Sequence, residues 1–290
     1  MSTPRSRYRL DAPADYSHRF HAGNVGDVWK HCVLVAVLER LAAMSPRVVY
    51  LDTHAGEGDY ALGPTGEWAE GIGRIWTGQG DGNQLVARYL SLCRSLGAGG
   101  DRPERYPGSP AFARAVLGPR AGLALWDADQ SARERLAAYV GSGETTRVTC
   151  GDGLQALADE VRRAEVSGDA AVALVDPPFV QKADWIAVPD AVARAALCSE
   201  RATVLLWYPV KSLTRPNAMI LRLKAAGVSG AIAELVTTPL EYQRRRLNGS
   251  GMLLVRPPAG TLEAIAAAAA VLGARCATRA DAWSFRMASW

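Results

Sequence analysis

The sequence lacks the features that mark membrane and secreted proteins. No apolar run reaches the roughly 18 residues needed to span a bilayer. The first twenty residues contain no apolar core, so they do not form a secretory signal. The five cysteines are scattered, without a Cys-x-x-Cys pair. Because such spacing favours reduced thiols, we expect a cytoplasmic protein without membrane contact.

Lysine is also scarce, and arginine supplies nearly all of the positive charge. Lysine occurs only at positions 30, 182, 211 and 224, and the net charge is +4. This balance favours a polyanionic partner only weakly. Arginine can pair with phosphate through two hydrogen bonds and stack on bases, but a GC-rich genome would produce the same bias. The run Arg244–Arg246 is accordingly either a solvated face or a phosphate contact.

Strand-like and helix-like segments alternate along most of the 290 residues. The alternation predicts an α/β fold with a mostly parallel, doubly wound sheet of seven strands. No helical pattern separates the last two strands, so we expect them to pair antiparallel. Residues 1–15 form a flexible extension and residues 60–106 an inserted helical subdomain within a domain spanning 16–290. The expected strands cover residues 47–52, 122–126, 146–150, 171–175, 203–207, 231–237 and 251–256.

A glycine-rich turn, Asp52-Thr-His-Ala-Gly56-Glu-Gly58, ends the first strand. Ligands of open α/β sheets bind at the carboxyl ends of the strands. Residues 56–61 match the G-x-G-x-x-A variant of the dinucleotide fingerprint, which leaves a nicotinamide-dependent oxidoreductase as an alternative. Asp127 and Asp152 end the next two strands, where they could accept from ribose hydroxyls and an adenine amine. Either could instead cap the following helix, as could Asp129.

The tetrad Asp176-Pro177-Pro178-Phe179 follows a strand that reads as buried. Two prolines fix the backbone and leave carbonyls without local amide partners. A carboxylate and a freed carbonyl can together accept hydrogen bonds from one exocyclic amine, and Phe179 offers a surface on which a base can stack. The alternative is an ordinary strand-terminating turn. This geometry suits an amine whose lone pair must leave conjugation with its ring before it can attack.

The tetrad resembles the motif of S-adenosylmethionine-dependent amino-methyltransferases. The chain as a whole resembles the bacterial 23S ribosomal RNA adenine-N6-methyltransferase family called RlmJ. The resemblance implies a Rossmann-like class I methyltransferase, monomeric, that acts on protein-free 23S ribosomal RNA. DNA adenine-N6 and protein glutamine methyltransferases share the tetrad and remain alternatives. The matching blocks are YSHRFHAGNVGDVWKH (16–31), LDTHAGEGDYAL (51–62), YPGSP (106–110), VDPPF (175–179), LWYPV (206–210) and SGMLLVRPP (250–258).

The resemblance also implies roles for individual residues. The catalytic acid falls on Asp176, and Tyr16 and His18 fall on the substrate side. Asp127 stands where glutamate is usual, and Phe179 replaces tyrosine. The four histidines lie within the first 54 residues, but without a metal-ligand spacing, so we expect no metal. The family's methyl-donor contacts fall on Lys30, His31, His54, Ser109, Asp127, Asp152 and Gly153.

Overall fold

The computed structural model describes residues 18–97, 99–119, 121–141, 143–242 and 247–290. The predictions made for residues 1–15, for Tyr16 and for Arg244–Arg246 fall outside these ranges. Within them, no helix is long and apolar enough to cross a membrane.

The described residues build an eight-stranded mixed sheet with the order β10-β8-β9-β7-β6-β1-β4-β5. From β7 to β5 all neighbours pair in parallel, whereas β9, β8 and β10 pair antiparallel. The mostly parallel sheet and the antiparallel β8–β9 pair confirm the predicted fold class. The strands are β1 (Val48–Asp52), β4 (Gly122–Asp127), β5 (Thr146–Cys150), β6 (Ala170–Val175), β7 (Thr203–Val210), β8 (Ala231–Val236), β9 (Gly249–Val255) and β10 (Ser284–Ser289).

The prediction of seven strands missed β10, which adds an edge next to β8. Its sequence, Ser-Phe-Arg-Met-Ala-Ser, has no β-branched residue, and its side chains are exposed or half-buried. Strand propensity is therefore weak here, and tertiary contacts hold the segment instead. Arg286 donates from Nε to Glu234 Oε2 at 2.6 Å and from Nη2 to Glu234 Oε1 at 2.9 Å.

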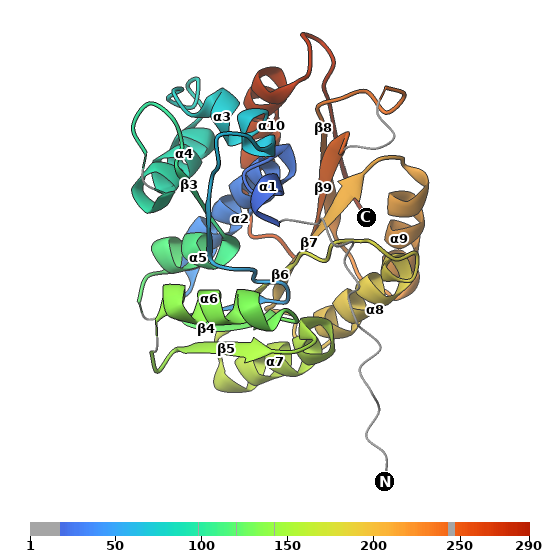
Figure 1. Cartoon of the computed structure of the whole chain (residues 1–290). Coiled ribbons are helices and arrows are strands. Elements are labelled where there is room, and N and C mark those ends of the chain that lie inside the picture. Colours follow the sequence, from blue (N-terminus) through green and yellow to red (C-terminus); the bar gives the residue numbers. More distant parts are fainter. Residues whose placement is uncertain (1–17, 98, 120, 142, 243–246) are drawn as a thin grey trace.

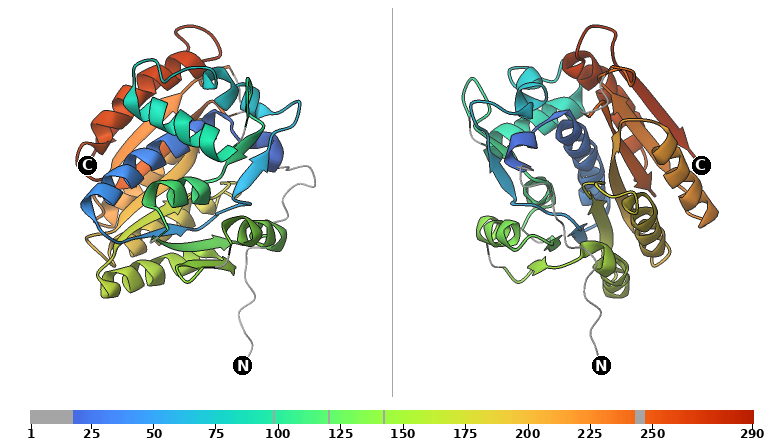
Figure 2. Two further views of the ribbon diagram at one scale, coloured as in Figure 1. Left: turned by 90° about the vertical axis from the view of Figure 1, so that its left-hand side faces the viewer. Right: turned by 45° about the vertical axis from the view of Figure 1, so that its right-hand side comes forward.

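Helices cover both faces of the sheet (Figures 1 and 2). Two apolar clusters fill the space between helices and sheet, one on each face. One face carries α2 (Val25–Met44), α4 (Gln84–Gly97), α5 (Ser109–Leu117), α6 (Gln130–Val140) and α10 (Thr261–Cys276). The other carries α7 (Gly153–Ser167), α8 (Asp184–Ala196) and α9 (Thr214–Ala225).

Helix α2 runs through the first cluster and carries two of the predicted site residues. Asn24 caps it by accepting from the Asp27 backbone N–H at 3.0 Å. The helix ends at Met44, because Pro46 cannot continue it. Most of its residues are buried, so its register fixes where Lys30 and His31 point.

The segment predicted as an insertion forms short elements between β1 and α5. Strands β2 (Asp59–Ala61) and β3 (Arg105–Pro107) pair antiparallel in a separate two-stranded sheet. Between them lie η1 (Glu67–Ala69), α3 (Ile72–Ile75) and α4. Tyr89 and Leu90 of α4 pack into the same cluster as α2. That residues 60–106 form a separate subdomain remains a prediction. A short helix, α1 (His18–His21), precedes α2.

Candidate active site

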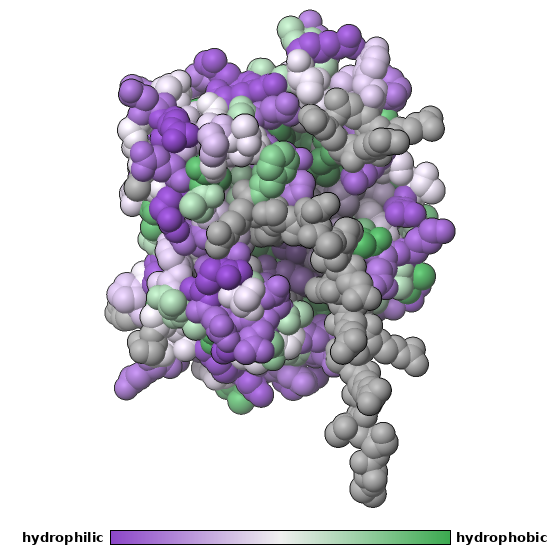
Figure 3. Space-filling view, viewed as in Figure 1, coloured by the Kyte–Doolittle hydropathy of each residue, from purple (hydrophilic) through white to green (hydrophobic). Residues whose placement is uncertain are grey.

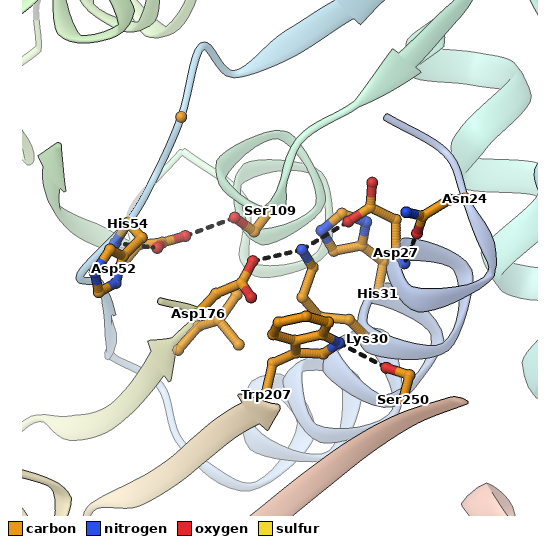
Figure 4. A network of polar contacts seen from close by, with 12 residues as sticks. Asn24, Asp27, Lys30, His31, Asp52, His54, Ser109, Asp176, Trp207 and Ser250 are labelled. Atoms are coloured by element: carbon orange, nitrogen blue, oxygen red, sulfur yellow. Dashed lines mark hydrogen bonds and ion pairs between the residues drawn. The ribbon is translucent and has the colours of Figure 1, made fainter. Parts of the chain in front are cut away.

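Those predicted site residues whose side chains the structure describes lie at the carboxyl ends of β1, β4, β5 and β6, on α2 and at the start of α5. Figure 4 shows Lys30, His31, His54, Ser109 and Asp176 among them. The space-filling view, in the orientation of Figure 1, shows a hollow near the middle of the molecule, lined by hydrophilic residues (Figure 3). Parallel strands bring their carboxyl ends to one edge of the sheet. Residues far apart in the sequence therefore meet there.

Lys30 and Asp176 form the central ion pair of the site. Lys30 Nζ lies 2.5 Å from Asp176 Oδ2 and 2.7 Å from Asp27 Oδ1. The Lys30 side chain is 9% exposed and lies 5.9 Å from the ring centre of Trp207. Burial alone would lower the pKa of Lys30, but the two carboxylates outweigh burial and raise that pKa above its usual range. Two of its three N–H groups are thus directed at carboxylates, which leaves one that points at neither.

Asp176 keeps one carboxylate oxygen for a ligand. Lys30 holds Oδ2, while Oδ1 accepts no hydrogen bond from the described residues. Nor does any described backbone N–H donate to the Pro177 carbonyl, as expected for a segment with two prolines. Two acceptors without a partner among the described residues therefore follow β6 in neighbouring residues. This pair is the one that the sequence predicted for an exocyclic amine.

Phe179 is more enclosed than a simple stacking platform. Only 7% of the residue is exposed, and its ring centre lies 4.4 Å from that of Trp185. Its φ of 49° is left-handed, which costs energy for an aromatic residue. The Asp-Pro-Pro-Phe segment is therefore strained at Phe179, whose ring packs in the second apolar cluster. Stacking of a base on this ring remains a prediction.

Asp52, at the end of β1, is a fully buried carboxylate with three donors. Tyr50 donates to Oδ2 at 2.7 Å, Ser109 donates to Oδ2 at 2.6 Å, and the His54 backbone N–H donates to Oδ1 at 3.2 Å. Burial raises the pKa of Asp52 to about 6, although these hydrogen bonds lower it. Asp52 thereby links His54 and Ser109, two of the residues that are predicted to contact the methyl donor. No role was predicted for Asp52 from the sequence. Its position at the end of β1, where the glycine-rich turn begins, could have indicated one.

The glycine-rich turn is closed by Asp127. The Gly56 backbone N–H donates to Asp127 Oδ2 at 2.9 Å, and the Asp129 N–H donates to Oδ1 at 2.8 Å. Gly56 has a φ of 64°, and a Cβ there would lie 2.0 Å from the Tyr60 hydroxyl oxygen. After Gly58 the chain enters strand β2. The dinucleotide fingerprint requires a helix at this point, so the alternative based on it loses its structural support.

Asp152 and Asp129 act as helix caps. Asp152 Oδ1 accepts from the backbone N–H groups of Leu154 and Gln155 at the start of α7, and Asp129 caps α6. A carboxylate has further lone pairs, so capping leaves Asp152 able to accept from a ligand. A Cβ on Gly153 would lie 2.5 Å from the Thr53 carbonyl oxygen. Glycine is therefore needed for β1 and α7 to approach each other.

His31 lies in a buried aromatic group below the site. Its Nδ1 is 2.8 Å from the Tyr106 hydroxyl, which in turn is 2.9 Å from the Tyr89 hydroxyl. Burial, assisted by the charge of Lys30, lowers the pKa of His31 to about 3. The imidazole is neutral at physiological pH, and its hydrogen bond to Tyr106 links α2 to the segment between β1 and α5.

His54 stands at the same edge as Asp52. Its Nδ1 lies 2.8 Å from the Thr53 hydroxyl, and burial lowers its pKa. Helix α1 contains His18, but the structure describes only its backbone there. Among the described residues, no group of three or more His, Cys, Asp and Glu could hold a metal ion.

A family model described as "Ribosomal RNA large subunit methyltransferase D, RlmJ" matches residues 45–287. The chain belongs to this family. Two curated relatives carry the name ribosomal RNA large subunit methyltransferase J. The Escherichia coli protein is 34% identical and the Haemophilus influenzae protein 33% identical, each over 249 residues, which cover 84% of this chain and 87% of the relative.

The fold also matches a solved structure. A crystal structure of a Legionella pneumophila protein superposes with a TM-score of 0.81 at 23% identity, covering 93% of this chain and 98% of that one. This likeness supports the fold alone. Together with the family and the strand order, it identifies a Rossmann-like class I methyltransferase fold, as the sequence analysis expected. The protein is accordingly a ribosomal RNA large-subunit methyltransferase by family.

Proposed function

We propose that this protein transfers a methyl group from S-adenosylmethionine to the exocyclic N6 of an adenine in protein-free 23S ribosomal RNA. The observation that carries the proposal is that Asp176 Oδ1 and the Pro177 carbonyl, just after β6, accept no hydrogen bond from the residues that the structure describes. Family membership supports the reaction class. The enzyme would act in the cytoplasm, as a monomer, before the RNA is fully assembled into a subunit.

The residues present fit the methyl donor. S-adenosylmethionine supplies an electrophilic methyl group on a positively charged sulfur. The carboxylates of Asp127 and Asp152 lie at the ends of neighbouring strands β4 and β5, where one would accept from ribose hydroxyls and the other from the adenine amine. The close packing of Gly153 on Thr53 and of Gly56 on Tyr60 would hold these two carboxylates in place at the edge of the sheet. Ser109, His31 and His54 would contact the methionine part.

The acceptor base would be held by the tetrad. A single-stranded adenine can be turned out of its stack, and its amino group would donate to Asp176 and to the Pro177 carbonyl. Both contacts favour the pyramidal form of N6. Phe179 would support the base, and Tyr16 and His18 would approach it from the substrate side. Catalysis would then consist of positioning and of dipoles aimed at N6, without a covalent enzyme intermediate. The bond from N6 to the methyl carbon would form as the bond from that carbon to sulfur breaks, and the surplus N6 proton would pass to water.

Lys30 would act chiefly by positioning. Its ammonium group fixes the Asp176 carboxylate through Oδ2, so that Oδ1 faces the amine. The same ammonium retains one N–H for the carboxylate of the donor, the contact that the family resemblance implies. The two roles are compatible because only two of the three protons point at Asp27 and Asp176.

Transfer of label from S-adenosylmethionine tests this proposal. Protein-free 23S ribosomal RNA, assembled large subunits, duplex DNA and a protein glutamine substrate are offered in parallel, and digested RNA is analysed by mass spectrometry. We expect N6-methyladenosine from protein-free RNA only. The Asp176→Ala variant should lose transfer and keep binding of S-adenosylhomocysteine. Full activity of that variant would refute the assigned mechanism, and label in DNA or protein alone would replace the substrate.

A further inference from the structure

Lys182, Lys211 and Arg215 form an exposed cationic rim beside the candidate active site, which we call the β6–β7 rim. Lys182 lies in the loop between β6 and α8, and Lys211 follows the last residue of β7. Arg215 belongs to the first turn of α9. All three residues are exposed. Half of the four lysines of the chain therefore stand on the two loops that leave strands β6 and β7.

Topology places these two loops side by side. Strands β6 and β7 pair in parallel with Val175 opposite Leu206, so Asp176 and Trp207 lie at the same level of the sheet. The helices that follow, α8 and α9, pack against each other on the same face (Figure 1). The β6–β7 rim consequently borders the edge at which Asp176 would receive its substrate.

The charge of the rim is not neutralised by the described protein. Some other exposed arginines are paired with acids, as Arg222 is with Asp190 and Arg275 with Asp81. Lys182, Lys211 and Arg215 form no ion pair or hydrogen bond with the described residues. Asp184, the acid closest in sequence to Lys182, is buried and accepts from the Gln181 backbone N–H. Charged groups left without a partner next to a substrate site are available to a ligand of opposite charge.

Exposed apolar side chains accompany the cations. Val180 is 61% exposed in the first loop and Leu213 is 39% exposed in the second. Phosphates bind cations, whereas unstacked bases contact apolar or aromatic surfaces. A surface that alternates the two suits a single strand of RNA better than a protein or a small molecule.

We propose that the β6–β7 rim binds the phosphates of the nucleotides that flank the target adenine. The proposal rests on the function proposed above and extends it to the path of the RNA. The cations would neutralise phosphates where the strand passes the loops that follow β6 and β7. They would therefore contribute to RNA affinity, to its salt dependence and to the register of the strand, and not to the transfer step itself.

The test compares two double variants that each remove two positive charges, one pair from the loops before α8 and α9 and the other from these helices themselves. Lys182→Ala with Lys211→Ala removes rim cations next to the helix starts. Arg194→Ala with Lys224→Ala removes exposed cations from the last turns of the same helices. Methylation of protein-free 23S ribosomal RNA is measured for wild type and both variants at several salt concentrations, with binding of S-adenosylhomocysteine as the check on folding.

We expect the rim variant to raise KM for RNA about tenfold near 0.15 M salt, with kcat within about twofold. Its plot of log KM against log salt should flatten by about 0.7 for each lost contact to a single strand. The control variant should match wild type. An unchanged KM and salt slope in the rim variant, with active wild type, would refute the rim while leaving the proposed function intact. Wild type that binds S-adenosylhomocysteine but neither binds nor methylates the RNA would refute both proposals.

Discussion

Replacement of Asp52 by asparagine should make the stability of the protein strongly dependent on pH. In the folded state burial raises the pKa of Asp52 to about 6, from 3.8. The folded protein therefore binds more protons at this site than the unfolded chain between these values, and stability falls as pH rises through this window. The difference amounts to about 3 kcal/mol, at 1.36 kcal/mol for each pH unit.

His31 acts in the opposite direction. Burial lowers its pKa to about 3, from 6.5, so the folded state binds fewer protons than the unfolded chain between these values. The contribution of His31 to the free energy of unfolding is largest above pH 6.5, and it decreases as the pH falls from 6.5 toward 3. Between pH 4 and 6 the two effects cancel in the wild type. Asp52→Asn removes one of them, so acidification over this range should cost the variant about 3 kcal/mol more than the wild type.

Urea unfolding of wild type and Asp52→Asn at constant ionic strength, from pH 4 to 7.5, measures this difference. Effects of other titrating groups cancel when the two free energies are subtracted at each pH. Ser109→Ala is the companion variant, because it keeps the carboxylate and removes a hydrogen bond that lowers its pKa. Its pH window should extend above 6. A difference between wild type and Asp52→Asn that stays constant across the range would refute the reasoning.

Two further predictions concern packing and the edge of the sheet. Gly153→Ala should lower the free energy of unfolding by about 1–3 kcal/mol, because the new Cβ would lie 2.5 Å from the Thr53 carbonyl oxygen. The calorimetric Tm should fall and the Kd of S-adenosylhomocysteine should rise. An unchanged Tm would contradict the close contact. Arg286→Met should lower the free energy of unfolding by about 2–3 kcal/mol, because the buried Glu234 carboxylate loses its cation. Adding Glu234→Gln should recover part of that loss in urea unfolding, and no recovery would argue against an unpaired charge.

Local patterns were sufficient to predict most of the elements. The seven strands expected from the sequence correspond to β1, β4, β5, β6, β7, β8 and β9, with bounds that differ by at most three residues. Strand β10 was missed because its stability comes from the pairing of Arg286 with Glu234, 52 residues away. A contact between segments so far apart leaves no periodic trace in either segment.

The site could be predicted as a set of residues but not as a set of contacts. The end of each strand marked Asp127, Asp152 and Asp176, since the topology brings these ends to one edge. The bond between Lys30 and Asp176 joins residues 146 apart in the sequence. It depends on the register of α2 against β6, which packing decides. The enclosure of Phe179 by Trp185 likewise follows from the left-handed turn at Phe179 and from the position of α8.

The Lys30–Asp176 pair combines two opposed electrostatic effects. In the proposed reaction positive charge passes from the donor sulfur to N6, and a carboxylate next to N6 stabilises it there. An ammonium group 2.5 Å from that carboxylate weakens this attraction. Lys30 would therefore be a poor choice if its purpose were charge stabilisation alone. Its value lies in orientation, because a half-buried carboxylate held by one oxygen presents the other in a fixed direction. Asp27, which takes a second Lys30 N–H, fixes the ammonium in turn.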